Sequence, residues 1–265
     1  MHALQHDLQR GLADLGLALD EARQAQLLAY LDLIGKWTQV YNLTAVRDAH
    51  EMLTHHVLDS LAVVLPLRRA LADMAALSTE GGAEGGASGG SSGGADGGDR
   101  GGAGEGGGAG AGGGEVAHVG QPARRPFRLL DVGAGAGLPG VVVAITCPEV
   151  AVTCVDTVAK KAAFVQQVAA NLKLPNLRGL HARVEQVCEP HDVVCSRAFA
   201  SLKDFTIWSR AALAPHGVWL AMKGKHPQAE LDELAAVQPP VHVFHVEPLQ
   251  VPGLDAERCI VWMRG

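Results

Sequence analysis

Apolar residues recur at helical spacing in the first part of the chain. Asp20 is a suitable N-cap, and the apolar positions after it lie three or four residues apart, which predicts a helix over residues 20–43. The apolar face of this helix consists of Leu27, Leu31, Ile34, Trp37 and Tyr41. A second helix is predicted over residues 49–67, with an apolar side made of Leu53, Val57, Leu58, Leu61 and Leu65.

From residue 127 onward the pattern changes to short, continuous apolar runs. They predict strands at residues 127–132, 150–156, 191–198 and 217–224, and a weaker strand at 177–182. Helical patterns lie between them, notably over 157–174, and strands that alternate with helices form parallel sheets through right-handed crossovers. The last two runs, 241–251 and 258–265, leave no room for a helix between them, so we expect an antiparallel pair at the sheet edge. The prediction is an α/β fold: a doubly wound, mostly parallel seven-stranded sheet with one reversed strand and an N-terminal helical extension.

One segment does not look like folding material. Residues 81–114 hold most of the chain's 33 glycines and nothing bulkier than Glu or Arg. Such a segment buries too little apolar surface to offset the entropy lost on ordering, so we expect it to be disordered. It lies between the helical region and the first strong strand, which indicates an inserted loop. The predicted organisation is a helical extension or cap over 1–78, an insertion over 79–122 and a core over 123–265.

The formal net charge of −6 means that the field of the whole protein does not favour nucleic acid. Any such contact must come from local basic patches, although each patch alone is more simply explained as solvated surface charge. The candidate patches are Arg124, Arg125 and Arg128; Lys160 and Lys161; Arg197 and Lys203; and Lys223, Lys225 and His226. The five cysteines lack C-x-x-C spacing, and neither a signal peptide nor an apolar run of membrane-spanning length is evident. We expect a soluble, reduced, cytoplasmic protein.

The stretch RLLDVGAGAGLPGVVVAI, residues 128–145, sets three glycines between the first strand and the next helix. Gly133, Gly135 and Gly137 let the backbone approach a ligand and adopt φ > 0 at the switch point of a doubly wound sheet. The turn fits the dinucleotide fingerprint G-x-G-x-x-G and equally the D-x-G-x-G-x-G turn of S-adenosylmethionine enzymes. Asp156, at the end of the second strand, suits the ribose of either cofactor. A tight turn without a ligand is the third interpretation.

The remainder of the chain separates the two cofactors. A dehydrogenase normally needs a second, substrate-binding domain, and the residues outside the sheet leave no room for one. The reversed last strand also favours the methyltransferase architecture. We therefore predict a class I, Rossmann-like, S-adenosylmethionine-dependent methyltransferase. Three rival functions stay in view: a methyltransferase with another substrate, an NAD-binding oxidoreductase, and a non-catalytic S-adenosylmethionine-binding module.

Several motifs together resemble one family over nearly the whole chain apart from the Gly-rich tract. They are NLTAVRD (42–48), HHVLDSL (55–61), LLDVGAGAGLPGVVVAI (129–145), LHARVEQ (180–186), SRAFASL (196–202) and MKG (222–224). Their order and spacing resemble bacterial ribosomal RNA small-subunit methyltransferase G, also called glucose-inhibited division protein B. The resemblance implies methyl transfer from S-adenosylmethionine to guanine N7 in the decoding-region hairpin of 16S rRNA. Its implied partner is 16S rRNA or a partly assembled small subunit, and we expect a monomer.

The resemblance also implies site residues. The expected cofactor contacts are Gly133 and Leu138 in the turn, Val184 and Glu185 after the third strand, and Arg197 after the fourth, with Gly135 and Asp156 added from the general architecture. Guanine N7 has a lone pair and no proton, so we expect alignment to do most of the catalysis and no general base to be present. Arg197 is expected to hold the methionine carboxylate or to donate to guanine O6. Phe199 is either a stacking platform for the base or a core residue.

The histidines could suggest a metal site. His55 and Asp59, four residues apart, could face one ion beside His56, but the chain has no H-E-x-x-H motif and no Cys/His cluster. We therefore expect no metal and place these residues in the helical cap over the site. Asn42 is expected to be a polar loop residue of the same cap.

Overall fold

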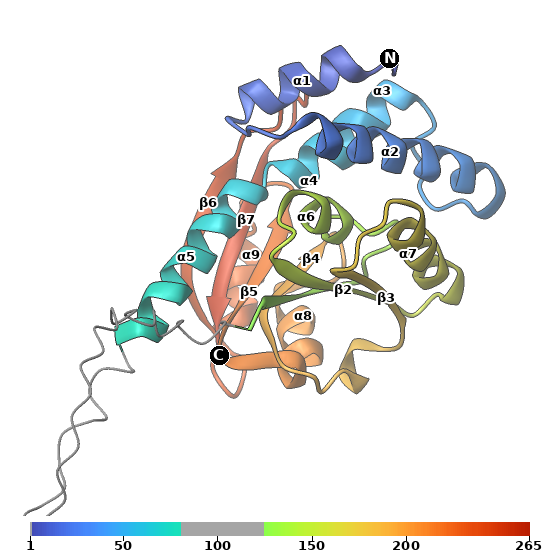
Figure 1. Ribbon diagram of the computed structural model, residues 1–265. Coiled ribbons are helices and arrows are strands. Elements are labelled where there is room, and N and C mark those ends of the chain that lie inside the picture. Colours follow the sequence, from blue (N-terminus) through green and yellow to red (C-terminus); the bar gives the residue numbers. More distant parts are fainter. Residues whose placement is uncertain (1, 81–124) are drawn as a thin grey trace, which may run out of the picture. The chain divides into compact units, whose positions relative to one another are not determined.

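The computed structural model describes residues 2–80 and 125–265. The Gly-rich tract for which we predict disorder lies outside these residues. Seven strands form one sheet in the order β3-β2-β1-β4-β5-β7-β6 (Figure 1). Their bounds are β1 Phe127–Val132, β2 Val150–Asp156, β3 Leu177–His181, β4 His191–Arg197, β5 Leu213–Lys223, β6 His242–Leu249 and β7 Arg258–Arg264.

The strand directions agree with the predicted fold class. β1 pairs in parallel with β2 and β4, and β4 pairs in parallel with β5. β7 is antiparallel to both β5 and β6, so the last strand of the chain is the reversed one. It lies between β5 and the edge strand β6. The predicted α/β, doubly wound, mostly parallel sheet is confirmed, and β1 and β2 begin and end where the apolar runs do.

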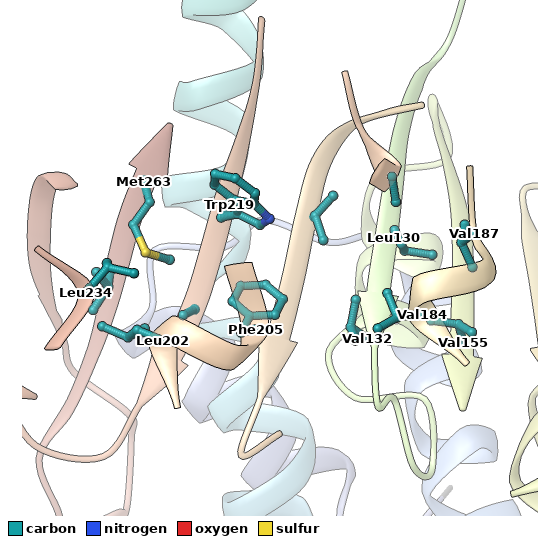
Figure 2. Close-up of a cluster of buried hydrophobic side chains, with 14 of the residues drawn as sticks. Leu130, Val132, Val155, Val184, Val187, Leu202, Phe205, Trp219, Leu234 and Met263 are labelled. Carbon is teal, nitrogen blue, oxygen red and sulfur yellow. The ribbon is translucent and has the colours of Figure 1, made fainter. Parts of the chain in front are cut away.

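The continuous apolar runs arise because both faces of the central strands are covered. Side chains of β1 alternate: Leu130 and Val132 belong to a buried cluster with Phe205 and Trp219, which Figure 2 shows between the sheet and α8 (Leu202–Ser209). On the opposite face β1 and β2 meet α6 (Gly140–Thr146), all of whose residues are buried, while α7 (Ala159–Asn171) covers β2 and β3. The remaining helical elements after β3 are η2 (Val184–Gln186), η3 (Arg210–Ala212) and α9 (Gln228–Leu234).

The N-terminal region is helical, as expected, but it is divided differently from the prediction. The predicted helix over 20–43 is α2 (Glu21–Tyr41), and the Asp20 side chain accepts from Arg23 N at 2.8 Å. A preceding helix, α1 (Gln5–Asp14), was not predicted. Residues up to Ala72 and from Pro126 onward form one compact unit that contains these helices and the sheet. The domain boundaries at 78, 79, 122 and 123 stay a prediction.

The single helix predicted over 49–67 is wrong. The segment consists of α3 (Ala49–Met52), a π-helical stretch η1 (Leu53–Leu58), α4 (Asp59–Leu61) and the start of α5 (Val64–Glu80). A π-helix has more residues per turn than an α-helix, so positions beyond it rotate away from the face that a 3.6-residue period assigns. Leu53, Val57, Leu58 and Leu61 are nevertheless buried, as predicted, whereas Leu65, which follows the interruption between α4 and α5, is 40% exposed.

The α2 helix contacts the turn that follows β1 and the two helices on that face of the sheet. It packs along α6 and α7 (Figure 1), and Gln26 Nε2 donates to Leu172 O at 2.9 Å near the far end of α7. The buried Tyr30 hydroxyl donates to Ala136 O at 2.6 Å, inside the turn that follows β1. No helix in the described part of the chain is long and apolar enough to span a membrane.

Candidate active site

The turn between β1 and α6 depends on glycine at three positions for different reasons. Gly133, Gly135 and Gly137 have φ of +66°, +59° and +88°, a region that side chains with a Cβ disfavour. A Cβ at Gly133 would lie 2.3 Å from Phe199 Cδ2, and one at Gly137 would lie 2.5 Å from Val141 Cγ2. A Cβ at Gly135 would meet only Gly133 O, at 3.9 Å. Packing therefore requires two of the glycines, and Gly135 is the one beside open space.

Asp131, at the start of the motif, is a structural support of the turn. Its side chain is fully buried, and Oδ2 accepts from Gly140 N at 2.8 Å, which fixes the first residue of α6. Oδ1 has no hydrogen-bond partner in the described structure. Burial raises the pKa of Asp131 to about 7, against the lowering effects of the Gly140 N–H and the Arg197 charge. The N-terminus of α6 thus already meets a carboxylate of the chain.

Asp156 lies at the end of β2, as predicted, but its carboxylate is turned toward the backbone. Oδ2 accepts from Gly135 N at 3.0 Å and Oδ1 from Val158 N at 2.8 Å, and the residue is 8% exposed. Lys161 Nζ lies 3.7 Å from Oδ2. Asp156 thereby joins the glycine turn to the start of α7. A carboxylate oxygen has a second lone pair, so a ribose contact at Asp156 stays a prediction.

Arg197 ends β4, directly beside β1 in the sheet, at the switch point where the two connections leave in opposite directions. Its Nη1 donates to His55 O and to Asp59 Oδ2, both at 2.8 Å. Neither Nε nor Nη2 has a hydrogen-bond partner among residues 2–80 and 125–265. The next residue, Ala198, has φ +51°, so the chain leaves β4 through a left-handed residue that is not glycine.

The other predicted site residues divide between core and surface. Leu138 and Val184 are each 5% exposed, and Val184 belongs to the cluster around Trp219 in Figure 2. Glu185 is exposed, and its own backbone N–H and Arg183 lower the pKa of its carboxyl. The half-buried Phe199 lies edge-on to Phe205, with ring centres 6.4 Å apart. Together with its contact over Gly133, this supports a packing role for Phe199 more than a free stacking platform.

Comparison with known proteins identifies the family of the chain. The model of the family described as rRNA small subunit methyltransferase G matches residues 23–75 and 115–261. The chain belongs to this family. A protein of Polaromonas sp. (strain JS666 / ATCC BAA-500) named ribosomal RNA small subunit methyltransferase G is 57% identical over 264 residues, covering 100% of this chain and 95% of that protein. The protein of the same name in Acidovorax ebreus (strain TPSY) is 55% identical over 262 residues, covering 99% and 96%.

Solved structures resemble the chain only in part. TrmN from Thermus thermophilus aligns with a TM-score of 0.42 and 21% identity, over 54% of this chain and 45% of that one. A likeness of this size adds nothing to the family match. Membership confirms the predicted enzyme class: the chain is an S-adenosylmethionine-dependent methyltransferase of small-subunit rRNA.

The residues present fit this methyl donor. Three features follow three different strands at the carboxyl edge of the sheet. They are the open space at Gly135, the exposed Glu185 after β3, and the Nε–Nη2 edge of Arg197, which has no hydrogen-bond partner in the described part of the chain. They offer close backbone approach, a carboxylate and a guanidinium, which suit an adenosine and an amino-acid carboxylate. Among the described residues, no group of three or more His, Cys, Asp or Glu side chains could hold a metal ion.

Two cap residues contribute to the site in a way that the sequence did not indicate. Asp59, 3% exposed, accepts from Arg197 and, through Oδ1, from Arg258 Nε at 2.8 Å. These partners lie 138 and 199 residues away in the chain. His56 contacts Thr44 Oγ1 through Nε2 at 2.7 Å. Asn42 is the C-cap of α2 in the left-handed region. The sequence marked Asp59 through the HHVLDSL motif and as a possible metal ligand near His55, but it indicated neither arginine partner.

Proposed function

We propose that the chain transfers a methyl group from S-adenosylmethionine to N7 of a guanine in the decoding-region hairpin of 16S rRNA. The observation that carries this proposal is the guanidinium of Arg197, which lies at the switch point beside the glycine turn and has no partner for its Nε–Nη2 edge within the described residues. That edge suits the methionine carboxylate, because a planar guanidinium can bind both carboxylate oxygens at once.

The other predicted site residues would bind different parts of the cofactor. Gly135 would admit the backbone of the turn to the ligand. Asp156 holds the turn against α7 and would accept from the ribose with its remaining lone pairs, and the segment Val184–Glu185 would contact the adenine. Val184 is buried, so its contribution there comes from the backbone, and Glu185 offers an exposed carboxylate. Leu138 is buried in the turn and supports its shape.

The reaction requires little acid–base chemistry from the protein. S-adenosylmethionine supplies an electrophilic methyl group on a sulfonium centre. Guanine N7 offers a lone pair without a proton, so the residues at the mouth of the site need only orient the base and exclude water. Alignment of this kind can lower a barrier by about 7–11 kcal/mol. The raised pKa of Asp131 is thus not needed for proton transfer, and burial in the turn explains it.

The substrate is reached at the same edge. Lys203 is exposed at the start of α8, which follows Arg197, and Trp208 on the same helix is 39% exposed. Guanine must be unstacked before its N7 can meet the methyl group, and sequence-specific RNA recognition commonly targets loops. We propose that rRNA approaches over the start of α8, beside Arg197.

The test is methylation of small-subunit rRNA from a strain that lacks the enzyme, either as naked 16S rRNA or as isolated subunits. Radiolabelled S-adenosylmethionine reports transfer, and nucleoside mass spectrometry with fragment mapping reports the position. We expect 7-methylguanosine in the decoding-region hairpin, and the preferred substrate form identifies the partner. A folded protein that binds the cofactor but methylates another position, or nothing, would contradict the proposal.

Arg197→Lys tests the assignment within the site. Lysine keeps the charge but cannot reproduce the two-point guanidinium contact. If Arg197 serves the cofactor, the variant raises the KM for S-adenosylmethionine and leaves the KM for RNA unchanged. A lower kcat with unchanged cofactor binding would assign Arg197 to guanine O6 instead.

A further inference from the structure

The strongest unexplained feature of the site is one buried carboxylate between two guanidinium groups. Asp59 is 3% exposed, whereas the Arg197 and Arg258 side chains are 21% and 24% exposed. Each Asp59 oxygen accepts one charge-assisted bond of 2.8 Å, from Arg197 Nη1 and from Arg258 Nε. Removing a carboxylate from water is costly, and one arginine would suffice to compensate it. Two arginines leave this cluster with a net positive charge at the carboxyl edge of the sheet.

The bonds to Arg197 occupy one end of its guanidinium only. Nη1 carries two hydrogens, and His55 O and Asp59 Oδ2 accept them, each at 2.8 Å. The opposite edge, made of Nε and Nη2, is the one that binds a carboxylate through two parallel hydrogen bonds. Because Nη1 is fixed at two points from the cap, the plane of the guanidinium is set before a ligand arrives.

The fixed group lies next to the glycine turn. In the sheet register Val132, the last residue of β1, pairs with Ser196, so Arg197 lies one residue beyond this pair, where the glycine turn begins. Arg258 begins β7, so Asp59 joins the cap to two strands at once. We infer that Asp59 is a positioning residue, which holds Arg197 from the cap side with Arg258 as its support, so that the Nε–Nη2 edge is presented to the methionine carboxylate of the cofactor. This inference rests on the proposed role of Arg197 in cofactor binding.

A purely structural role for Asp59 is the alternative. In that case the carboxylate ties α4 to the sheet, and its loss would loosen the whole cofactor site. The two roles separate if two ligands are compared. S-adenosylhomocysteine carries the amino-acid carboxylate, and 5′-methylthioadenosine keeps the adenosine and sulfur but lacks that carboxylate.

The experiment is calorimetric titration of the full chain with both ligands. Asp59→Asn keeps the shape of the side chain but turns an N–H group toward an arginine donor. We expect this variant to weaken the affinity for S-adenosylhomocysteine by about tenfold or more, because a charge-assisted contact is mispositioned. The affinity for 5′-methylthioadenosine should change by less than about twofold. Equal weakening of both ligands, or no change in either, would overturn the inference.

The chain offers a matched control at the opposite edge of the sheet. Glu189 also accepts from two arginines, Arg178 at 2.6 Å and Arg128, but it precedes β4 and lies away from the glycine turn. Glu189→Gln should leave the affinities for both ligands unchanged. In an Arg197→Ala background, Asp59→Asn should add less than about threefold to the dissociation constant for S-adenosylhomocysteine, because Asp59 acts through Arg197. Full additivity would contradict that route.

If Asp59→Asn does not fold, a second variant tests the same inference. Arg258→Gln removes the support of Asp59 at a side chain that is 24% exposed and leaves the Asp59–Arg197 pair in place. It should weaken the affinity for S-adenosylhomocysteine by about threefold and leave that for 5′-methylthioadenosine unchanged. Equal weakening of both affinities, or no change in either, would again contradict the inference. None of these titrations involves RNA. The two proposals therefore fail separately. If the variants weaken the two ligands unequally but the wild-type protein does not methylate 16S rRNA, the proposed substrate is refuted and the role of Asp59 is not.

Discussion

Gly133→Ala tests whether the glycine turn is required by the protein itself or by a ligand. The residue has φ +66°, and an added Cβ would lie 2.3 Å from Phe199 Cδ2 and 3.0 Å from Cε2. An alanine in the left-handed region costs about 1–2 kcal/mol. Moving the Phe199 ring, which is held between Gly133, Phe205 and Trp208, adds a further cost of about 1–3 kcal/mol. We expect the free energy of unfolding to fall by about 2–5 kcal/mol.

Urea denaturation of four proteins separates the two contributions: wild type, Gly133→Ala, Phe199→Ala and the double variant. In the Phe199→Ala background the steric part disappears, so Gly133→Ala should cost only about 1–2 kcal/mol there. The control is Gly35→Ala inside α2, where the added Cβ would meet nothing within 4 Å in the described structure beyond the adjoining residues and backbone of its own helix. It should stabilise the protein by about 0.5–1 kcal/mol. An equal cost of Gly133→Ala in both backgrounds, or a cost below about 0.5 kcal/mol, would refute the assignment of the Phe199 contact.

Three further variants test the supports of the turn. Tyr30→Phe leaves Ala136 O without its 2.6 Å donor in a buried place and should lower the free energy of unfolding by about 1–3 kcal/mol in urea denaturation; no loss would mean that water replaces the hydroxyl. Asp156→Ala should lower the affinity for S-adenosylmethionine by about tenfold or more in calorimetry while the protein stays folded. An unchanged affinity would restrict the role of Asp156 to its two backbone contacts. The pKa of Asp131 is raised from 3.8 to about 7, so the folded protein keeps a proton that the unfolded chain loses, and the resulting stability declines as pH rises across that window. Asp131→Asn, which cannot titrate, should therefore gain stability relative to wild type as the pH rises from 3.8 to about 7, and a pH-independent difference in denaturation midpoints would contradict the raised pKa.

Local patterns were informative wherever burial on both faces or a single capping contact determines the conformation. β1 and β2 coincide with their apolar runs because a central parallel strand is covered on both sides. Asp20 caps α2 as predicted, since a helix N-terminus needs an acceptor within three residues. The prediction of a single helix over residues 49–67 was wrong, because a π-helical stretch at Leu53–Leu58 and a break between α4 and α5 divide the segment, and Leu65 beyond the break is exposed. A 3.6-residue pattern cannot register such a change, because the wider turn is stabilised by packing against other elements.

The residues that belong to the site could be named from the sequence, but their contacts could not. Motif and strand order placed the glycine turn, Asp156 and Arg197 at the carboxyl edge of one sheet, because parallel strands connected by helices all end there. Tertiary structure alone decided that Phe199 covers Gly133, that the Asp156 carboxylate faces the backbone, and that Arg197 meets Asp59 138 residues away. Strand ends follow from the local alternation of apolar and polar residues. The direction of a side chain at such an end depends on which distant donors and acceptors the completed fold brings within hydrogen-bond distance.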